Sequence, residues 1–173
     1  PQSYLRDHIS YVQQKAWLFS GTIAENLRYS DKTASDEKLM HAADVAQAGD
    51  LIRSLPDGLN AYVAQGGTNF SGGQRQRLSI ARALVKKPEL FIFDDSFSAL
   101  DFKTDAALRR ALANETSDAA VLIITQRIST IRHAEQIIVL HDGQMVGKGT
   151  HDELMQGCPV YQEIYRSQIK EGQ

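Results

Sequence analysis

The sequence has little of what would mark a secreted, membrane-spanning or strongly nucleic-acid-binding protein. Cys158 is its single cysteine, so no intrachain disulfide can form and a reducing cytosol is compatible with the chain. No apolar run approaches the roughly 20 residues that span a membrane, and no signal peptide is visible. The net charge of −2 argues against a dominant electrostatic grip on nucleic acid, although local basic patches remain open.

Two kinds of ligand site are also missing. The histidines show no paired spacing of the kind that holds zinc; they are His8, His41, His133, His141 and His151. A phosphate-binding loop that ends in Gly-Lys-Ser/Thr is absent as well. The one Gly-Lys pair, Gly147-Lys148, is followed by Gly149 and belongs to an expected hairpin.

The pattern that is present predicts an α/β fold. At 173 residues the chain can bury a core as one domain, or as one domain with an insertion. Strands and helices that alternate along the second half favour a mainly parallel sheet. We expect strands at 8–12, 90–94, 120–125, 136–141 and 144–148, and helices at 22–27, 36–48, 51–54, 73–85, 102–114, 128–132, 151–156 and 159–170. Asp142-Gly143 predicts a tight hairpin, and Thr150 with Glu153 predicts a capping box.

Residues 71–74 predict an anion-binding helix start. Ser71 is a good N-cap, and Gly72-Gly73 leave the first backbone N–H groups free of side-chain cover. Such a helix start points unpaired donors and a partial positive charge at its ligand, which suits phosphate.

A pair of carboxylates follows the next expected strand. The run Leu90–Phe93 is uniformly apolar and is typical of a parallel strand buried on both faces. Asp94 and Asp95 then fall at its carboxyl end, where open α/β sheets place their ligands. These two carboxylates are suited to bind a magnesium ion that is carried by a nucleotide.

These motifs together resemble the nucleotide-binding domain of ATP-binding cassette (ABC) transporters. The matching segments, in chain order, are Ile9–Gln14 and Leu18–Leu27 (the Q-loop region of exporter-type members), Ser71–Gln74 (the signature), Leu90–Asp94 (Walker B), Ser98–Asp101 (the D-loop) and Leu122–Arg127 (the H-loop region). The resemblance covers nearly the whole chain, and the order and spacing of the motifs are highly specific.

The resemblance implies a P-loop NTPase-like, mainly parallel sheet with an inserted α-helical subdomain. Residues 1–14 and 86–173 would form part of the ATP-binding core, and residues 15–85 the helical subdomain that contacts the membrane domains. The family places its Walker A loop upstream of Pro1, so the chain is expected to be an N-terminally truncated piece. By itself it should bind ATP poorly and hydrolyse little.

The resemblance also assigns roles to individual residues. Gln14 and Asp94 would hold Mg²⁺, and Gln14 would also sense the membrane domains. Asp101 would belong to the ATP-binding D-loop. The signature residues Ser71, Gly72, Gly73 and Gln74 would contact the γ-phosphate of an ATP held by a partner subunit.

The catalytic positions Asp95 and Gln126 depart from the family pattern. The family usually has Glu after the Walker B aspartate, and Asp is shorter by one carbon–carbon bond, about 1.5 Å. A misplacement of about 1 Å can cost about a hundredfold in rate. The usual H-loop residue is His, whereas Gln126 cannot become cationic or shuttle protons. The family charges expected at Gln65 and Gly66 are missing too.

We therefore expect a subunit of an asymmetric, heterodimeric ABC exporter at the cytoplasmic face of the cell membrane. Its partners would be a second nucleotide-binding domain and the transmembrane domains, with ATP and Mg²⁺ as cofactors and no nucleic acid. Its own site would be degenerate, while its signature would complete the competent site of the partner. A homodimeric exporter with a slow site and a soluble ABC ATPase acting on ribosomes or DNA are the alternatives. The transported substrate stays open among drugs, lipids and peptides.

Overall fold

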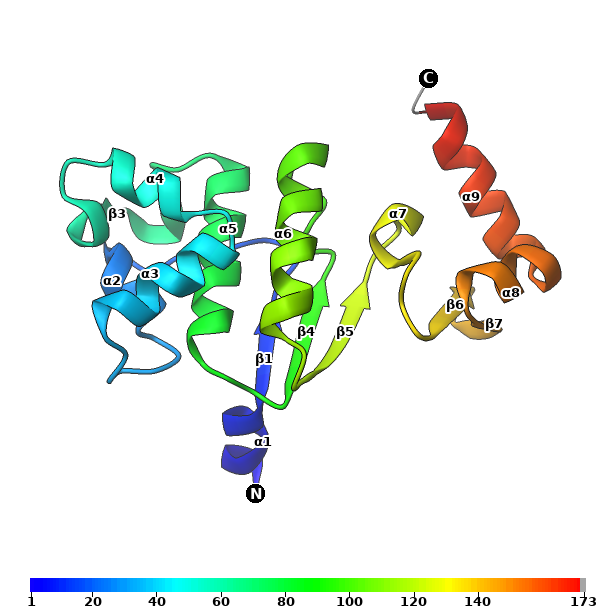
Figure 1. Ribbon diagram of the computed structural model, residues 1–173, viewed down its shortest axis with the longest axis horizontal. Coiled ribbons are helices and arrows are strands. Elements are labelled where there is room, and N and C mark those ends of the chain that lie inside the picture. The colour runs from blue at the N-terminus through cyan, green and yellow to red at the C-terminus, as the bar shows by residue number, and fades with distance from the viewer. Residues whose placement is uncertain (172–173) are drawn as a thin grey trace. The chain divides into compact units, whose positions relative to one another are not determined.

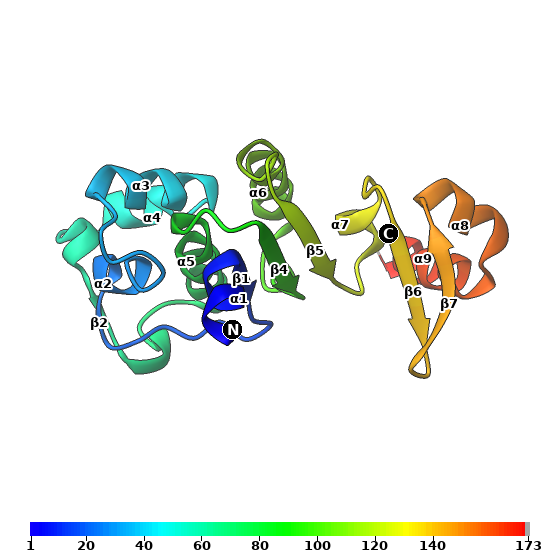
Figure 2. The ribbon, with the colours of Figure 1, turned by 90° about the horizontal axis from the view of Figure 1, so that it is seen from below.

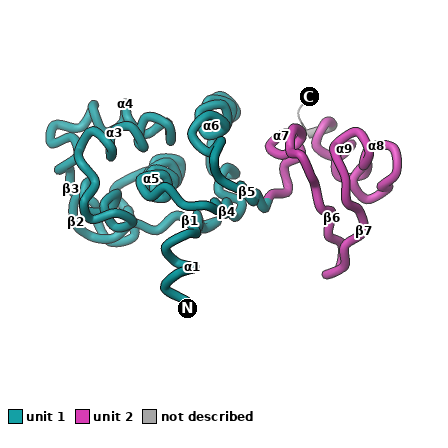
Figure 3. The backbone as a smooth tube through the Cα atoms, turned by 60° about the horizontal axis from the view of Figure 1, so that its bottom comes forward, with its two compact units in different colours: residues 1–124 teal, residues 125–173 magenta. Residues whose placement is uncertain are grey.

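The computed structural model describes residues 1–171, and the chain separates into two compact units. The first unit is Pro1–Ile124 and the second begins at Thr125 (Figure 3).

The first unit is built from short strands and helices (Figure 1). Its elements are α1 (Gln2–His8), β1 (Ile9–Val12), β2 (Gly21–Thr22), α2 (Ile23–Leu27), α3 (Asp36–Val45), α4 (Gly49–Ser54), the 3₁₀ turn η1 (Gly58–Asn60), β3 (Tyr62–Val63), the 3₁₀ turn η2 (Gln65–Gly67), α5 (Gly72–Val85), β4 (Leu90–Asp94), α6 (Phe102–Glu115) and β5 (Ala120–Ile124). The α/β class and the parallel sheet are confirmed. Helix α1, the two-residue strands β2 and β3, and both 3₁₀ turns were not predicted.

The parallel sheet has the strand order β1-β4-β5, and one of its faces is covered. Phe91 and Phe93 of β4 project from that face together with Val12 of β1, and all three are buried. They belong to one apolar cluster with Leu108 and Leu112 of α6 and with the apolar residues of α5. Figure 2 shows α6 lying over β4 and β5 on this side.

The opposite face of the sheet is open within the described residues. The parallel register pairs Tyr11 with Ile92 and Ile92 with Leu122, so the three side chains share this face. Tyr11 is 52% exposed, Leu122 49% and Ile124 48%. The prediction that strand 90–93 is buried on both faces is therefore wrong for the described chain, because residues 90 and 92 are only half-buried.

Helix α3 is shorter than the predicted helix 36–48. It ends at Val45 because Gln47 adopts a left-handed backbone with φ of +59°. The N–H of Ala48 donates to the Ala43 carbonyl at 2.7 Å, and the N–H of Gln47 donates to the Asp44 carbonyl at 3.0 Å. These two bonds form a Schellman motif, which ends a helix by satisfying its last carbonyls.

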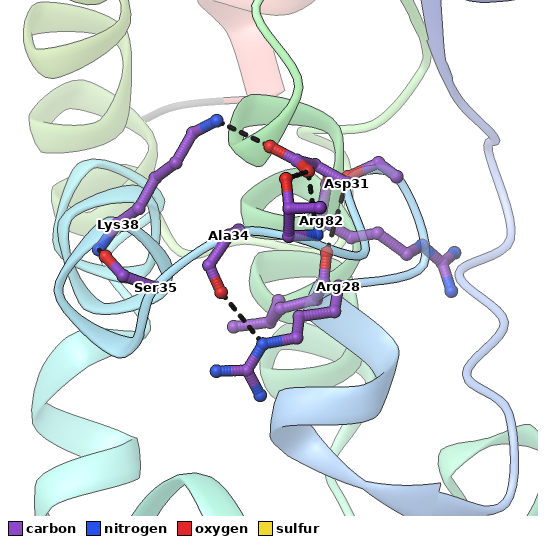
Figure 4. Close-up of polar contacts among 9 residues, drawn as sticks. Arg28, Asp31, Ala34, Ser35, Lys38 and Arg82 are labelled. Carbon is purple, nitrogen blue, oxygen red and sulfur yellow. Dashed lines mark hydrogen bonds and ion pairs between the residues drawn. The ribbon is translucent and has the colours of Figure 1, made fainter.

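The connection between α2 and α3 is held by polar side chains (Figure 4). Arg28 Nε donates to the Ala34 carbonyl at 2.9 Å, and Lys38 Nζ lies 2.7 Å from Asp31 Oδ2. The hydrogen bond from Lys38 lowers the pKa of Asp31 to about 2. The loop is thus fixed from both of its ends.

The second unit contains a hairpin and three helices, α7 (Ile128–Ile131), β6 (Ile137–His141), β7 (Gln144–Gly149), α8 (His151–Gly157) and α9 (Pro159–Glu171). Strands β6 and β7 are antiparallel, as the Asp142-Gly143 turn predicts. The predicted capping box at the start of α8 is confirmed by bonds in both directions between Thr150 and Glu153. Tyr161 of α9 is 2% exposed and packs in a small core with Ile137 of β6.

Candidate nucleotide-binding site

The start of α5 is arranged as the sequence predicts. Ser71 Oγ accepts a hydrogen bond from the Gln74 N–H at 3.2 Å, and the Gln74 side chain accepts one from the Ser71 N–H at 2.9 Å. This reciprocal capping box fixes the first residue of the helix. Gly72 is exposed, and a Cβ placed on it would meet nothing within 4 Å. The backbone of the first turn is therefore accessible to a ligand.

The next residue, Gly73, packs tightly. A Cβ placed there would lie 3.3 Å from the carbonyl oxygen of Ala99. The start of α5 thus lies directly against the segment 98–101, which leads from β4 into α6. At the end of that segment Asp101 is the N-cap of α6, where it accepts hydrogen bonds from the N–H and the hydroxyl of Thr104. These bonds, the backbone one first, lower the pKa of Asp101.

Asp94 and Asp95 lie at the carboxyl end of β4, as expected. Asp94 is the last strand residue, and Asp95 follows with φ of +44°, a left-handed conformation that Asp tolerates better than most residues. The N–H of Asp95 donates to the Ile124 carbonyl at 2.7 Å. Gln14 Nε2 donates to Asp95 Oδ2 at 3.3 Å, so the structure brings together three of the predicted site residues.

Three further side chains fasten this edge of the sheet, and sequence reasoning missed them. Tyr11 Oη donates to Asp94 Oδ2 at 2.7 Å, Ser96 Oγ donates to the Val12 carbonyl at 2.9 Å, and buried Gln76 donates from Nε2 to the Gln13 carbonyl at 3.3 Å. The sequence did contain a signal for Tyr11, because its side chain ends in a polar hydroxyl group within the short strand expected at 8–12. The sequence gives no local signal for Gln76, because its partner lies 63 residues earlier in the chain.

The hydrogen bond to Asp94 also sets the ionisation of Tyr11. It is the main cause that raises the pKa of the phenol above its ordinary value. A phenol is already protonated at neutral pH, so the hydroxyl acts as the donor in its bond to the carboxylate.

Gln126 belongs to the second unit. It is exposed and precedes α7, and its backbone carbonyl accepts a hydrogen bond from the Gln168 side chain of α9. The Gln168 side chain also accepts a hydrogen bond from the Ile128 N–H at 3.0 Å, which holds this turn to α9. The placement of Gln126 against the carboxylates of the first unit stays a prediction.

The donors at the end of β4 fit magnesium. Asp94, Asp95 and the amide oxygen of Gln14 are the oxygen ligands that Mg²⁺ prefers. Within the described residues, no three His, Cys, Asp or Glu side chains gather into a metal cage. Mg²⁺ usually needs none, because it binds through one or two carboxylates together with water and phosphate oxygens.

Comparison with known proteins agrees with this α/β nucleotide-binding architecture. The family model for "ABC transporter" matches residues 1–98. The chain belongs to the ABC transporter family, and it is an ATP-binding domain homologous to those of exporter-type members.

Individual relatives extend the match to nearly the whole chain. The uncharacterised ABC transporter ATP-binding protein YfiB of Bacillus subtilis is 47% identical over 98% of this chain and 29% of its own length. The ATP-dependent lipid A-core flippase of Chromobacterium violaceum is 39% identical over 100% of this chain and 30% of its own. The solved structure of a bacterial Atm1-family ABC exporter with ATP bound superposes with a TM-score of 0.94 at 34% identity, over 97% of this chain and 30% of that one.

The chain therefore spans less than a third of the length of these relatives. Among residues 1–171, no helix has both the length and the apolar character that crossing a membrane requires.

Proposed function

We propose that this chain is the ATP-binding part of an ABC exporter, where it couples ATP binding and hydrolysis to substrate export. The observation that carries this proposal is the accessible, capped start of α5 on the same unit as the Asp94–Asp95 edge. A helix start binds phosphate, and the carboxylate edge suits magnesium. Residues 1–14 and 86–173 would form the partial core, and 15–85 the helical subdomain.

The two ends of residues 71–101 would serve different nucleotides. In a head-to-tail dimer, Ser71–Gln74 would contact the γ-phosphate of ATP on the partner, while Asp94, Gln14 and Asp101 would serve the chain's own site. Mg²⁺, when bound, would offset phosphate charge and polarise the transferred group. Asp95 would orient the attacking water and accept its proton.

The chain's own site is proposed to be degenerate. Asp95 accepts a bond from Gln14 at 3.3 Å, but its carboxylate is one methylene shorter than the glutamate usual in the family. Gln126 replaces the usual histidine and cannot carry a proton. A site with both changes would hold ATP and turn it over slowly, and a partner subunit would supply the faster site.

The membrane domains are proposed to contact an aromatic surface on the first unit. Trp17, Phe19 and Tyr29 are large side chains that are 48%, 43% and 66% exposed. Phe19 stacks on Tyr29 with ring centroids 4.8 Å apart, and the guanidinium of Arg82 lies 5.6 Å from the Phe19 ring. A cavity of about 160 Å³ opens beside them. Clustered exposed aromatics favour protein contact, which would place the chain at the cytoplasmic face of the membrane.

Arg82 would help to orient that contact. Its Nη2 donates to the Trp17 carbonyl at 2.9 Å, whereas Nη1 is buried without a hydrogen-bond partner among the described residues. Burial lowers the pKa of this guanidinium. Beneath this surface, buried Gly66, with φ of +76°, lies close to the Trp17 ring. The lack of family charges at Gln65 and Gly66 would leave this contact mainly aromatic.

Vanadate trapping of the complete transporter tests the proposal. Trapped nucleotide should concentrate in the site that contains the signature Ser71–Gln74 and the partner's Walker motifs. Equal trapping at both sites would contradict the asymmetry and favour a homodimer-like exporter with two working sites. No vanadate-sensitive ATP hydrolysis at either site would contradict the proposed function itself. The 173-residue chain alone should show little hydrolysis.

A further inference from the structure

A tyrosine in β1 reaches the carboxylate expected to face magnesium. Tyr11 Oη lies 2.7 Å from Asp94 Oδ2, a length typical of a hydroxyl that donates to a carboxylate. The contact joins two residues 83 positions apart in the chain. It lies within the first unit and beside the predicted metal ligand.

The strand register explains why these two side chains meet. Tyr11 pairs with Ile92 across the β1–β4 ladder, and Asp94 is two residues further along β4. Residues two apart on a strand share a face, so Tyr11 and Asp94 project on the same, open side of the sheet. A diagonal neighbour at this separation is within reach of a long aromatic side chain.

Tyr11 contacts Asp94 from a strand, whereas Gln14 contacts Asp95 from a loop. Tyr11 is inside a paired strand, whereas Gln14 lies in the loop that follows β1. Ser96 ties the same strand end to β4 by donating to the Val12 carbonyl at 2.9 Å. The contact to Asp94 is therefore held by the sheet, and the contact to Asp95 depends on the loop.

We propose that Tyr11 is a positioning residue for magnesium binding. By donating to Oδ2 it fixes the rotamer of the Asp94 carboxylate and leaves Oδ1 to coordinate the metal or to accept a hydrogen bond from its water shell. Partners that orient a metal ligand typically change metal affinity about tenfold to a hundredfold when removed. The inference rests on the proposed Mg–ATP site.

The test compares Tyr11→Phe with wild type in the full-length transporter. ATP binding is titrated with Mg²⁺, and Mn²⁺ binding is followed by electron paramagnetic resonance with ATP present. The half-saturating metal concentration should rise about tenfold in Tyr11→Phe, while ATP binding without metal stays unchanged. Tyr62→Phe is the matched control, since Tyr62 is 63% exposed on β3, away from the carboxylates.

The outcomes separate the inference from the function on which it rests. Equal metal titrations for wild type and Tyr11→Phe, within about twofold, would overturn the role of Tyr11 and leave the proposed function standing. A wild-type protein that binds ATP without any metal dependence would overturn both. A lower melting temperature combined with an unchanged metal titration would assign Tyr11 a structural role and overturn the inference.

Discussion

Asp95 has a shorter side chain than glutamate and a left-handed backbone, and its length leads to a prediction about the rate of ATP hydrolysis. Asp95→Glu in the full-length protein should raise turnover at the chain's own site by about tenfold to a hundredfold, because the added methylene extends the carboxylate by about 1.5 Å. Nucleotide trapped with vanadate at that site is the measurement. Asp95→Asn removes the base and is the control, which should lower the already slow turnover further. No gain with Glu would show that Asp95 does not limit the site.

A second residue prediction concerns pH. Asp31 has a pKa of about 2 in the folded protein, below its ordinary value of 3.8, because Lys38 donates to it. Its contribution to stability is complete above about pH 4 and is lost as the pH falls through about 2. Asp31→Asn should therefore lower the melting temperature at pH 5, with a difference that shrinks toward pH 2. A difference in melting temperature between Asp31→Asn and wild type that stays the same from pH 5 to pH 2 would refute the prediction.

Residue roles were predictable from the sequence only where the determinants are local. The Ser71 N-cap and the Thr150–Glu153 capping box each depend on residues close together in the sequence, and both are confirmed. The contact between Tyr11 and Asp94 depends on the register of two strands. No local pattern specifies that register, so this part of the candidate site was missed.

At the scale of the element, the two capping boxes provide matched variants. Ser71→Ala and Thr150→Ala should each cost about 1 kcal/mol of stability, because each leaves a helix-start N–H unpaired. Only Ser71→Ala should also abolish ATP hydrolysis at the partner's site, since α5 is the helix proposed to meet phosphate. Thermal melting and ATPase assays measure the two effects. Equal loss of activity in both variants would assign Ser71 a purely structural role.

Long, periodic elements were predicted well and irregular ones were not. The helices α5 and α6 agree with their predicted ranges to within about one residue. Helix α3 ends early because its Schellman motif is centred on Gln47, which is neither Gly nor Asn. Helix α1 buries no residue, so it lacks the apolar periodicity from which a helix is predicted.

The open face of the parallel sheet leads to a prediction about the stability of the whole molecule. Tyr11, Leu122 and Ile124 expose apolar surface there, which we expect other segments of a longer protein to cover. Leu122→Lys should then be tolerated in the 173-residue chain but should lower the melting temperature of the full-length protein by about 5 °C or more. Ala113→Lys, on the exposed side of α6, is the control. Equal tolerance of Leu122→Lys in both proteins would show that the face stays open.

Domain organisation was the hardest level to predict. The sequence suggested a core of 1–14 and 86–173 with an inserted helical subdomain, which stays a prediction. The structure separates the chain into two compact units, the second of which begins after Ile124. In the first unit the helices α3 and α6 contact each other, so the helical part and the sheet share one apolar cluster. Boundaries of this kind depend on long-range packing that composition does not record.

The tight contact between Gly73 and the Ala99 carbonyl has a consequence for how two ATP sites could be timed. In the proposed dimer, α5 meets the nucleotide of one site and the segment 98–101 borders the other. Because residue 73 is glycine, the Ala99 carbonyl oxygen can lie 3.3 Å from the place where a Cβ would stand, so a larger side chain there would press on the segment 98–101. If the proposed dimer forms, the close approach of these two segments gives one chain a direct physical link between the nucleotide that it contacts on its partner and its own.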